Sequence, residues 1–131
     1  MGLLDFLTGG PKKDPAHITD ANFEDEVAAF KGPVVIDFWG PSCSWCAKMV
    51  PTIRILAAKY DGRVKIGELD VSASPGVASQ FGVKGTPTLL FIRNGRVAER
   101  LVGFQTQMYI EEVIAAHFAD AVAGDALPEK K

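Results

Sequence analysis

The protein has 131 residues, of which 47% are hydrophobic and 23% are charged, and its formal net charge is −2. This length suits a single domain with its own hydrophobic core, and the charge gives no electrostatic basis for binding nucleic acid. No segment approaches the roughly 18 consecutive apolar residues of a membrane-spanning helix, and the first residues lack the basic start of a signal peptide. We therefore expect a cytoplasmic protein with neither nucleic acid nor membrane among its partners.

The first elements of the chain precede its two cysteines. Gly9-Gly10-Pro11 predicts a flexible extension over residues 1–15. A short strand is expected near 16–18, followed by a helix that begins at Thr19 or Asp20. The apolar stripe of that helix comprises Phe23, Val27 and Phe30.

The two cysteines follow the most apolar run of the chain. Residues 34–38 suit a strand buried on both faces. Cys43 and Cys46 come next in a Cys-x-x-Cys spacing, and a helix with a kink at Pro51 is expected from about Cys43 to Tyr60. Such a helix places both sulfurs on one face, with the first at the N-terminus, where unpaired N–H groups and the helix dipole stabilise a thiolate. A stabilised thiolate beside a second thiol is the minimum requirement for thiol–disulfide exchange.

The second half of the chain predicts strands and helices in alternation. Ser74 is expected to cap a short helix with Pro75 at its first position, and Asn94-Gly95 predicts a tight hairpin turn. The elements are expected over residues 64–71, 75–81, 88–92, 97–102 and 106–121. The buried stripe of the last helix is expected to comprise Ile110, Val113, Ile114, His117 and Phe118.

This order of elements predicts an α/β fold. A strand–helix–strand unit followed by a hairpin and a closing helix gives a central mixed sheet of roughly four or five strands, flanked by about four helices. The domain is expected over residues 16–121, between a flexible extension of residues 1–15 and a disordered tail of residues 122–131.

Several separated segments resemble the thioredoxin family. A Cys-x-x-Cys pair beside a strand–helix–strand pattern is typical of its redox motif. The resemblance covers about residues 16–120 and implies the thioredoxin fold. The segments that carry it are Asp37-Phe38-Trp39, Pro51, Leu69-Asp70-Val71, Ser74-Pro75-Gly76, Val83-Lys84-Gly85-Thr86-Pro87-Thr88-Leu89, Asn94-Gly95 and Val102-Gly103.

The resemblance implies a protein-disulfide reductase, or dithiol–disulfide oxidoreductase, with a redox-active Cys43–Cys46 disulfide. Cys43 is expected to attack a substrate disulfide and Cys46 to resolve the mixed disulfide. Asp37 is expected to be poorly solvated, with a raised pKa, and to help take the proton of Cys46. Pro87 is expected to be cis, with the Thr86 backbone beside Cys43 and ready to pair with an extended substrate.

Three positions depart from the family pattern. Ser44 and Trp45 stand between the cysteines in place of Gly and Pro, and Trp45 is expected to add an N–H near the Cys43 sulfur and to present an aromatic ring to substrate. Glu68 stands where thioredoxins usually carry lysine. If Glu68 lies near the buried aspartate, one of the two carboxylates is expected to hold its proton. Thr86 precedes the cis-proline where isoleucine is often found.

No cofactor or metal is expected. The sequence lacks a G-x-G-x-x-G pattern, and the only histidines, His17 and His117, lie far in sequence from the cysteines that a four-ligand zinc site would need. The resemblance implies that disulfide-containing proteins are substrates and that a thioredoxin-reductase-type partner supplies electrons to a monomer. The surface that faces substrate is expected to comprise Trp39, Ser44, Trp45, Gly85, Thr86, Pro87 and Gly103.

Two alternatives to a general reductase remain open. One is a redox partner dedicated to a single target protein. The other is a non-catalytic binding or chaperone module, because a fold does not fix a function.

Overall fold

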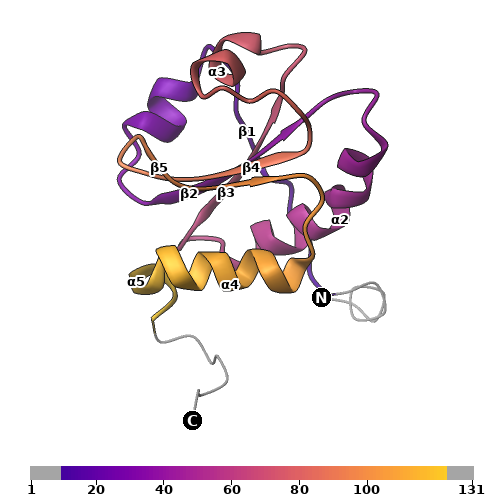
Figure 1. Ribbon diagram of the computed structural model, residues 1–131. Coiled ribbons are helices and arrows are strands. Elements are labelled where there is room, and N and C mark those ends of the chain that lie inside the picture. Colours follow the sequence, from indigo (N-terminus) through magenta and orange to yellow (C-terminus); the bar gives the residue numbers. More distant parts are fainter. Residues whose placement is uncertain (1–9, 124–131) are drawn as a thin grey trace.

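A five-stranded sheet forms the middle layer of the protein in a computed structural model that describes residues 10–123 (Figure 1). The strand order is β1-β3-β2-β4-β5. β1, β2 and β3 run parallel, β4 is antiparallel to β2, and β5 is antiparallel to β4. The predicted α/β fold with a mixed sheet is confirmed. The strands are β1 (Ala16–His17), β2 (Pro33–Trp39), β3 (Lys65–Asp70), β4 (Thr88–Arg93) and β5 (Arg96–Val102).

Helices cover both faces of this sheet. On one face lie α2 (Ser44–Lys59), α4 (Gln107–His117) and α5 (Ala119–Val122). On the other lie the π-helical turn η1 (Glu24–Ala28) and α3 (Pro75–Gln80). The longest helix, α2, has 16 residues, and none in the described part of the chain has the length and apolar character needed to cross a membrane.

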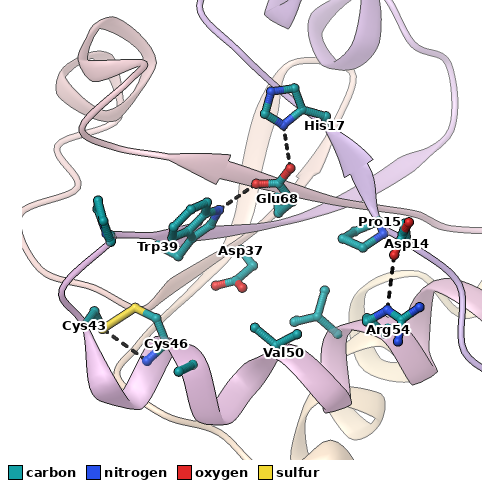
Figure 2. Close-up of a pocket in the computed structure, with 14 residues that line it drawn as sticks. Asp14, Pro15, His17, Asp37, Trp39, Cys43, Cys46, Val50, Arg54 and Glu68 are labelled. Atoms are coloured by element: carbon teal, nitrogen blue, oxygen red, sulfur yellow. Dashed lines mark hydrogen bonds and ion pairs between the residues drawn. A yellow bond between two sulfur atoms is a disulfide. The ribbon is translucent and has the colours of Figure 1, made fainter.

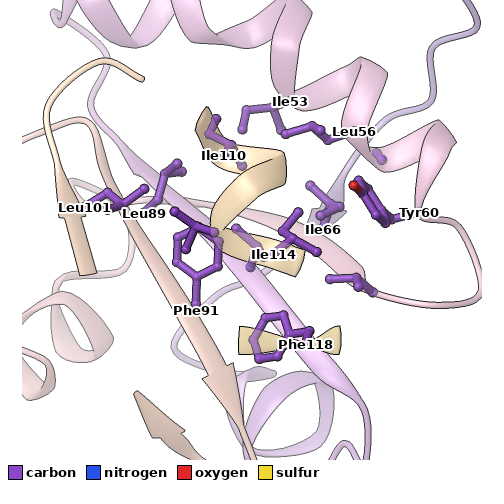
Figure 3. Packing of buried hydrophobic residues seen from close by; sticks show 14 of the residues in the cluster. Ile53, Leu56, Tyr60, Ile66, Leu89, Phe91, Leu101, Ile110, Ile114 and Phe118 are labelled. Carbon is purple, nitrogen blue, oxygen red and sulfur yellow. The ribbon is translucent and has the colours of Figure 1, made fainter. Parts of the chain in front are cut away.

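Two hydrophobic cores, one on each face, hold the layers together. Ile53 and Leu56 from α2 meet Ile110 and Ile114 from α4 over the first face (Figure 3). Successive residues of β2 alternate between the cores, as the period of a strand requires: Val35 packs in this core, whereas Val34, Ile36 and Phe38 pack in the other. Asp37 therefore points to the same side as Val35, under α2.

The predicted helix over residues 106–121 is interrupted. α4 ends at His117, and α5 begins after Phe118. Phe118 occupies the buried position one turn after Ile114, and this leaves His117 exposed, with its Nε2 3.6 Å from the Glu99 carboxylate. The prediction that His117 belongs to the buried stripe is therefore wrong.

The predicted first helix is a single turn. Phe23 and Val27 are buried as expected, whereas Phe30 is half-buried. The helix begins at Glu24, so the predicted start at Thr19 or Asp20 is wrong. A turn comes first, in which the Thr19 hydroxyl accepts the Asn22 N–H at 3.2 Å and the Asn22 side chain accepts the Thr19 N–H at 2.7 Å.

Asp20 caps a different helix from the predicted one. Its two carboxylate oxygens accept the N–H groups of Gly76 and Val77 at 2.9 and 2.8 Å, at the N-terminus of α3. Ser74, the expected cap, makes no side-chain bond to this helix, and its hydroxyl instead accepts the N–H of Asp20 at 3.1 Å. The cap of α3 thus comes from a loop more than 50 residues earlier.

The described part of the N-terminal extension packs along α2. The Lys13 N–H donates to the Arg54 carbonyl at 3.0 Å, its ammonium lies 2.6 Å from Asp61, and Asp14 pairs with Arg54 at 3.2 Å. The predicted flexible residues 1–9 and tail residues 124–131 lie outside the described residues. Val122, which the prediction places in the tail, is buried.

Replacing Asp20 with alanine should destabilise the protein. Loss of a helix cap costs about 1 kcal/mol, within a range of about 0.5–2 kcal/mol, and Asp20→Asn should retain part of this stability. Urea unfolding of the oxidised protein measures the change. Asp25→Ala is the control, because Asp25 is exposed and no hydrogen bond or ion pair is found for it among the described residues. Equal stability of Asp20→Ala and Asp25→Ala would contradict the assigned cap.

Candidate active site

The two cysteines lie at the first turn of α2. A turn after β2, in which the Cys43 N–H donates to the Gly40 carbonyl at 3.3 Å, leads the chain into the helix. Cys43 is the N-cap and its sulfur accepts the Cys46 N–H at 3.1 Å. The two sulfurs form a disulfide, with Cys43 half-buried and Cys46 only 3% exposed. Cys43 is therefore the sulfur that a second molecule can reach.

The N–H that bonds the Cys43 sulfur belongs to Cys46 and not to Trp45. The expectation that the Trp45 N–H favours the Cys43 thiolate concerns the reduced protein and stays a prediction. A helix cap accepts from the second or third residue after it, and here the third residue, Cys46, fills that place.

Trp45 instead lies on the surface beside the cysteines. It is 54% exposed, its ring centroid is 5.3 Å from that of Phe104, and the Lys48 ammonium lies 5.0 Å from the ring. Sequence reasoning missed Phe104. Its one signal is an aromatic residue directly after the Val102-Gly103 pair.

The cis-proline loop approaches the same sulfur. The Thr86–Pro87 bond is cis, as the resemblance implied, and the Thr86 carbonyl oxygen lies 3.5 Å from the Cys43 sulfur. The Gly103 N–H donates to the Pro87 carbonyl at 2.8 Å, and the Thr88 hydroxyl donates to the Gly85 carbonyl at 2.6 Å. These bonds hold the loop of Gly85, Thr86 and Pro87, with Gly103 beside it, against the start of α2.

Asp37 lies behind the cysteines on β2. It is 3% exposed, and its Oδ1 has no hydrogen-bond partner among the described residues. Burial, with a smaller contribution from the negative charge of Glu68, raises its pKa from 3.8 to about 7. The expected poorly solvated carboxylate is present, and near neutral pH it exists in both protonation states.

Glu68 lies beside Asp37 and is held by two side chains. The two residues are paired in the parallel register of β2 and β3. The Trp39 indole donates to Glu68 Oε1 at 2.6 Å, and His17 Nδ1 lies 2.6 Å from Glu68 Oε2 (Figure 2). The sequence raised the question of whether Glu68 approaches Asp37, but it predicted neither of these contacts.

A cavity of about 560 Å³ joins these residues. It runs between α2 and the strands, with both cysteines at one end and Arg54 at the other (Figure 2). Within residues 10–123, no three side chains of histidine, cysteine, aspartate or glutamate are grouped so that they could hold a metal ion. The polar and charged side chains that line the cavity are Asp14, His17, Asp37, Trp39, Cys43, Cys46, Arg54 and Glu68.

Comparison with known proteins gives the same family. The thioredoxin family model matches residues 14–116. The chain is 38% identical over 101 residues to a thioredoxin of Haemophilus influenzae, and the aligned region covers 77% of this chain and 94% of that protein. It is 37% identical over 100 residues to a thioredoxin of Staphylococcus saprophyticus (76% and 94%) and 31% identical over 102 residues to thioredoxin 1 of a Nostoc species (78% and 95%).

The chain therefore belongs to the thioredoxin family, and its five-stranded mixed sheet flanked by helices is the thioredoxin fold. It is a thioredoxin-type thiol–disulfide oxidoreductase, with the Cys-x-x-Cys pair Cys43–Cys46 as its redox pair.

Asp37→Asn should remove part of the pH dependence of stability. The raised pKa means that the folded protein holds a proton that the unfolded chain releases above about pH 4, so wild-type stability falls as the pH rises from 3.8 to about 7. Each pKa unit is worth about 1.4 kcal/mol, which gives a loss of up to about 4 kcal/mol. Urea unfolding of both oxidised proteins between about pH 4 and 8 measures it. The same pH slope in both proteins would contradict the burial of an ionisable Asp37.

Proposed function

We propose that Cys43 is the nucleophile, Cys46 the resolving cysteine and Asp37 the base of a protein-disulfide reductase. The observation that carries the proposal is the contrast between the two sulfurs. Cys43 is half-buried at a helix N-terminus and its sulfur accepts an N–H, whereas Cys46 is buried. Both line the same cavity as Asp37, a carboxylate whose pKa is raised to about 7.

In this mechanism, the Cys43 thiolate attacks one sulfur of a substrate disulfide. A Cys43–substrate disulfide forms, and the other substrate sulfur leaves as a thiolate that takes a proton from solvent. Asp37 then accepts the proton of Cys46, whose thiolate attacks the Cys43 sulfur. The Cys43–Cys46 disulfide forms, and the second substrate sulfur leaves and is protonated. Two electrons pass from the dithiol to the substrate.

The proposed substrate surface surrounds the Cys43 sulfur. We expect the Thr86 backbone, whose carbonyl oxygen lies 3.5 Å from the Cys43 sulfur, to pair with an extended substrate segment. Trp45 has an exposed ring that could contact the same substrate. The variant Ser44-Trp45 pair belongs to this surface. Its proposed members are Trp39, Ser44, Trp45, Gly85, Thr86, Pro87 and Gly103.

The proposed partners follow from the chemistry of the redox pair. A disulfide-containing protein oxidises the pair, so a donor must reduce it again, and a thioredoxin-reductase-type partner is proposed for that step. A monomer in the cytoplasm, where thiols are kept reduced, is proposed as the working form. A redox partner dedicated to one protein is the second candidate. The exposed Trp45 packed on Phe104 favours it, because a fixed aromatic anchor selects among partners.

Reaction of the reduced protein with dithiobis(nitrobenzoate) should release thionitrobenzoate in two phases. Cys43 releases the first equivalent and Cys46 the second. Cys46→Ser should keep only the first phase, and Cys43→Ser should lose the fast first phase, because the buried Cys46 is a poor nucleophile. Asp37→Asn should slow the second phase by about 10²-fold at neutral pH. Stopped-flow absorbance measures both phases. A fast first phase in Cys43→Ser would reverse the assignment.

Trp45→Ala should weaken the reduction of protein disulfides. Loss of an exposed aromatic anchor costs about 1–2 kcal/mol, which lowers kcat/KM for insulin by about five- to thirtyfold. The first phase with the small aromatic disulfide should stay unchanged. Val97→Ala is the matched control, because Val97 is also an exposed apolar residue. It lies near the start of β5, whereas the Thr88–Val102 pair next to the cis-proline loop lies at the other end of that strand. Equal kcat/KM for both variants would exclude Trp45 from the substrate surface.

A further inference from the structure

Asp37 needs a route by which its proton can reach solvent. A base that takes a proton in each turnover must also release it, but Asp37 is 3% exposed and its Oδ1 has no hydrogen-bond partner among the described residues. The cavity that Asp37 lines is the space open to that proton.

Glu68 and His17 line the same cavity and lead away from Asp37 (Figure 2). Glu68 is half-buried and neighbours Asp37 in the sheet register, whereas the His17 side chain is 69% exposed. Only 2.6 Å separates Glu68 Oε2 from His17 Nδ1. Carboxylate and imidazole are the side-chain groups that most often carry protons near neutral pH.

The hydrogen bond from Trp39 occupies one oxygen of Glu68 and leaves the other to exchange a proton. Its indole N–H, which can only donate, occupies Oε1 at 2.6 Å. Oε2 is therefore the oxygen that shares a proton with His17. This contact fixes the carboxylate between the buried end of the cavity and the exposed imidazole.

We propose that Glu68 and His17 carry protons between Asp37 and solvent, with water in the cavity joining Asp37 to Glu68. The cavity volume of about 560 Å³ is large beside the roughly 10–15 Å³ that one water needs, and the two carboxylates supply its polar partners. This inference rests on the proposed role of Asp37. His17 and Glu68 act on the resolving step only through Asp37 and do not touch the reacting sulfurs.

The other charged groups near this route have partners of their own. Asp14 and Arg54, which also line the cavity, are paired with each other at 3.2 Å. Asp70, at the end of β3, accepts the N–H and the hydroxyl of Ser72 at 2.8 and 2.7 Å.

The transfer is balanced without any redox partner. The Cys46 thiol loses its proton to Asp37, and the proton passes through water to Glu68 and from Oε2 to Nδ1 of His17. The imidazolium then releases a proton to solvent. Reduction of the disulfide by a donor returns a proton to Cys46 along the same groups in reverse.

Histidine variants in the two-phase thionitrobenzoate reaction test this route. His17→Gln keeps a hydrogen-bonding side chain that cannot carry a proton, and it should slow the second phase by about tenfold near pH 6–7, less than the loss of Asp37 itself. Above about pH 9, where solvent can deprotonate a thiol directly, the effect should disappear. The first phase should not change. His117→Gln is the matched control, because the chain has only two histidines and His117 is exposed at the end of α4.

Added imidazole supplies a second readout that a structural role would not produce. It should restore the second phase of His17→Ala, which leaves room for it beside Glu68, and should not affect His117→Ala. The route is overturned if both His17 variants match the wild type at every pH, if they are slowed equally above about pH 9, or if imidazole restores nothing. Two other outcomes would overturn the role of Asp37, and this inference with it. One is a wild-type reaction without a second phase, and the other is an Asp37→Asn variant whose second phase has the wild-type rate at every pH.

Discussion

The main constraint on this site is a buried carboxylate whose Oδ1 has no hydrogen-bond partner among the described residues. The register of β2 and β3 places Asp37 beside Glu68, under the helix that carries the cysteines. Keeping a charge there costs several kcal/mol, a large fraction of the 5–15 kcal/mol that stabilises an ordinary domain. Strongly perturbed acids in a cavity are concentrated at functional sites.

The fold makes the two sulfurs unlike each other. β2 ends at Trp39 and α2 begins at Ser44, so the short turn between them puts Cys43 at the helix N-terminus, where it receives an N–H. Cys46 faces inward one turn later. Both cysteines line the cavity, but Cys43, the proposed nucleophile, is half-buried beside the cis-proline loop, whereas Cys46, the proposed resolving cysteine, is buried. Exchange chemistry needs this division, because one sulfur must be reactive and the other held in reserve.

Local signals predicted most of the fold and the centre of the site. The apolar run before Cys43, the Cys-x-x-Cys spacing and the Asn94-Gly95 turn each depend on neighbouring residues, and all are confirmed. Two contacts between distant segments were not predicted. Asp20 caps α3 across more than 50 residues, and His17 reaches Glu68 across 51, so both depend on a strand register that no local pattern specifies. His117 was misplaced because its helix ends early, at a break that the apolar period does not mark.

The most direct test of this account is the titration of the Asp37 carboxyl carbon by nuclear magnetic resonance in the oxidised protein, where no thiol titrates. The account predicts a midpoint near pH 7, which falls when Glu68 is replaced by glutamine. A midpoint near 3.8, the ordinary value for an aspartate, would show that Asp37 is fully ionised at neutral pH. It would contradict the proposal that Asp37 exchanges the proton of Cys46 near neutral pH.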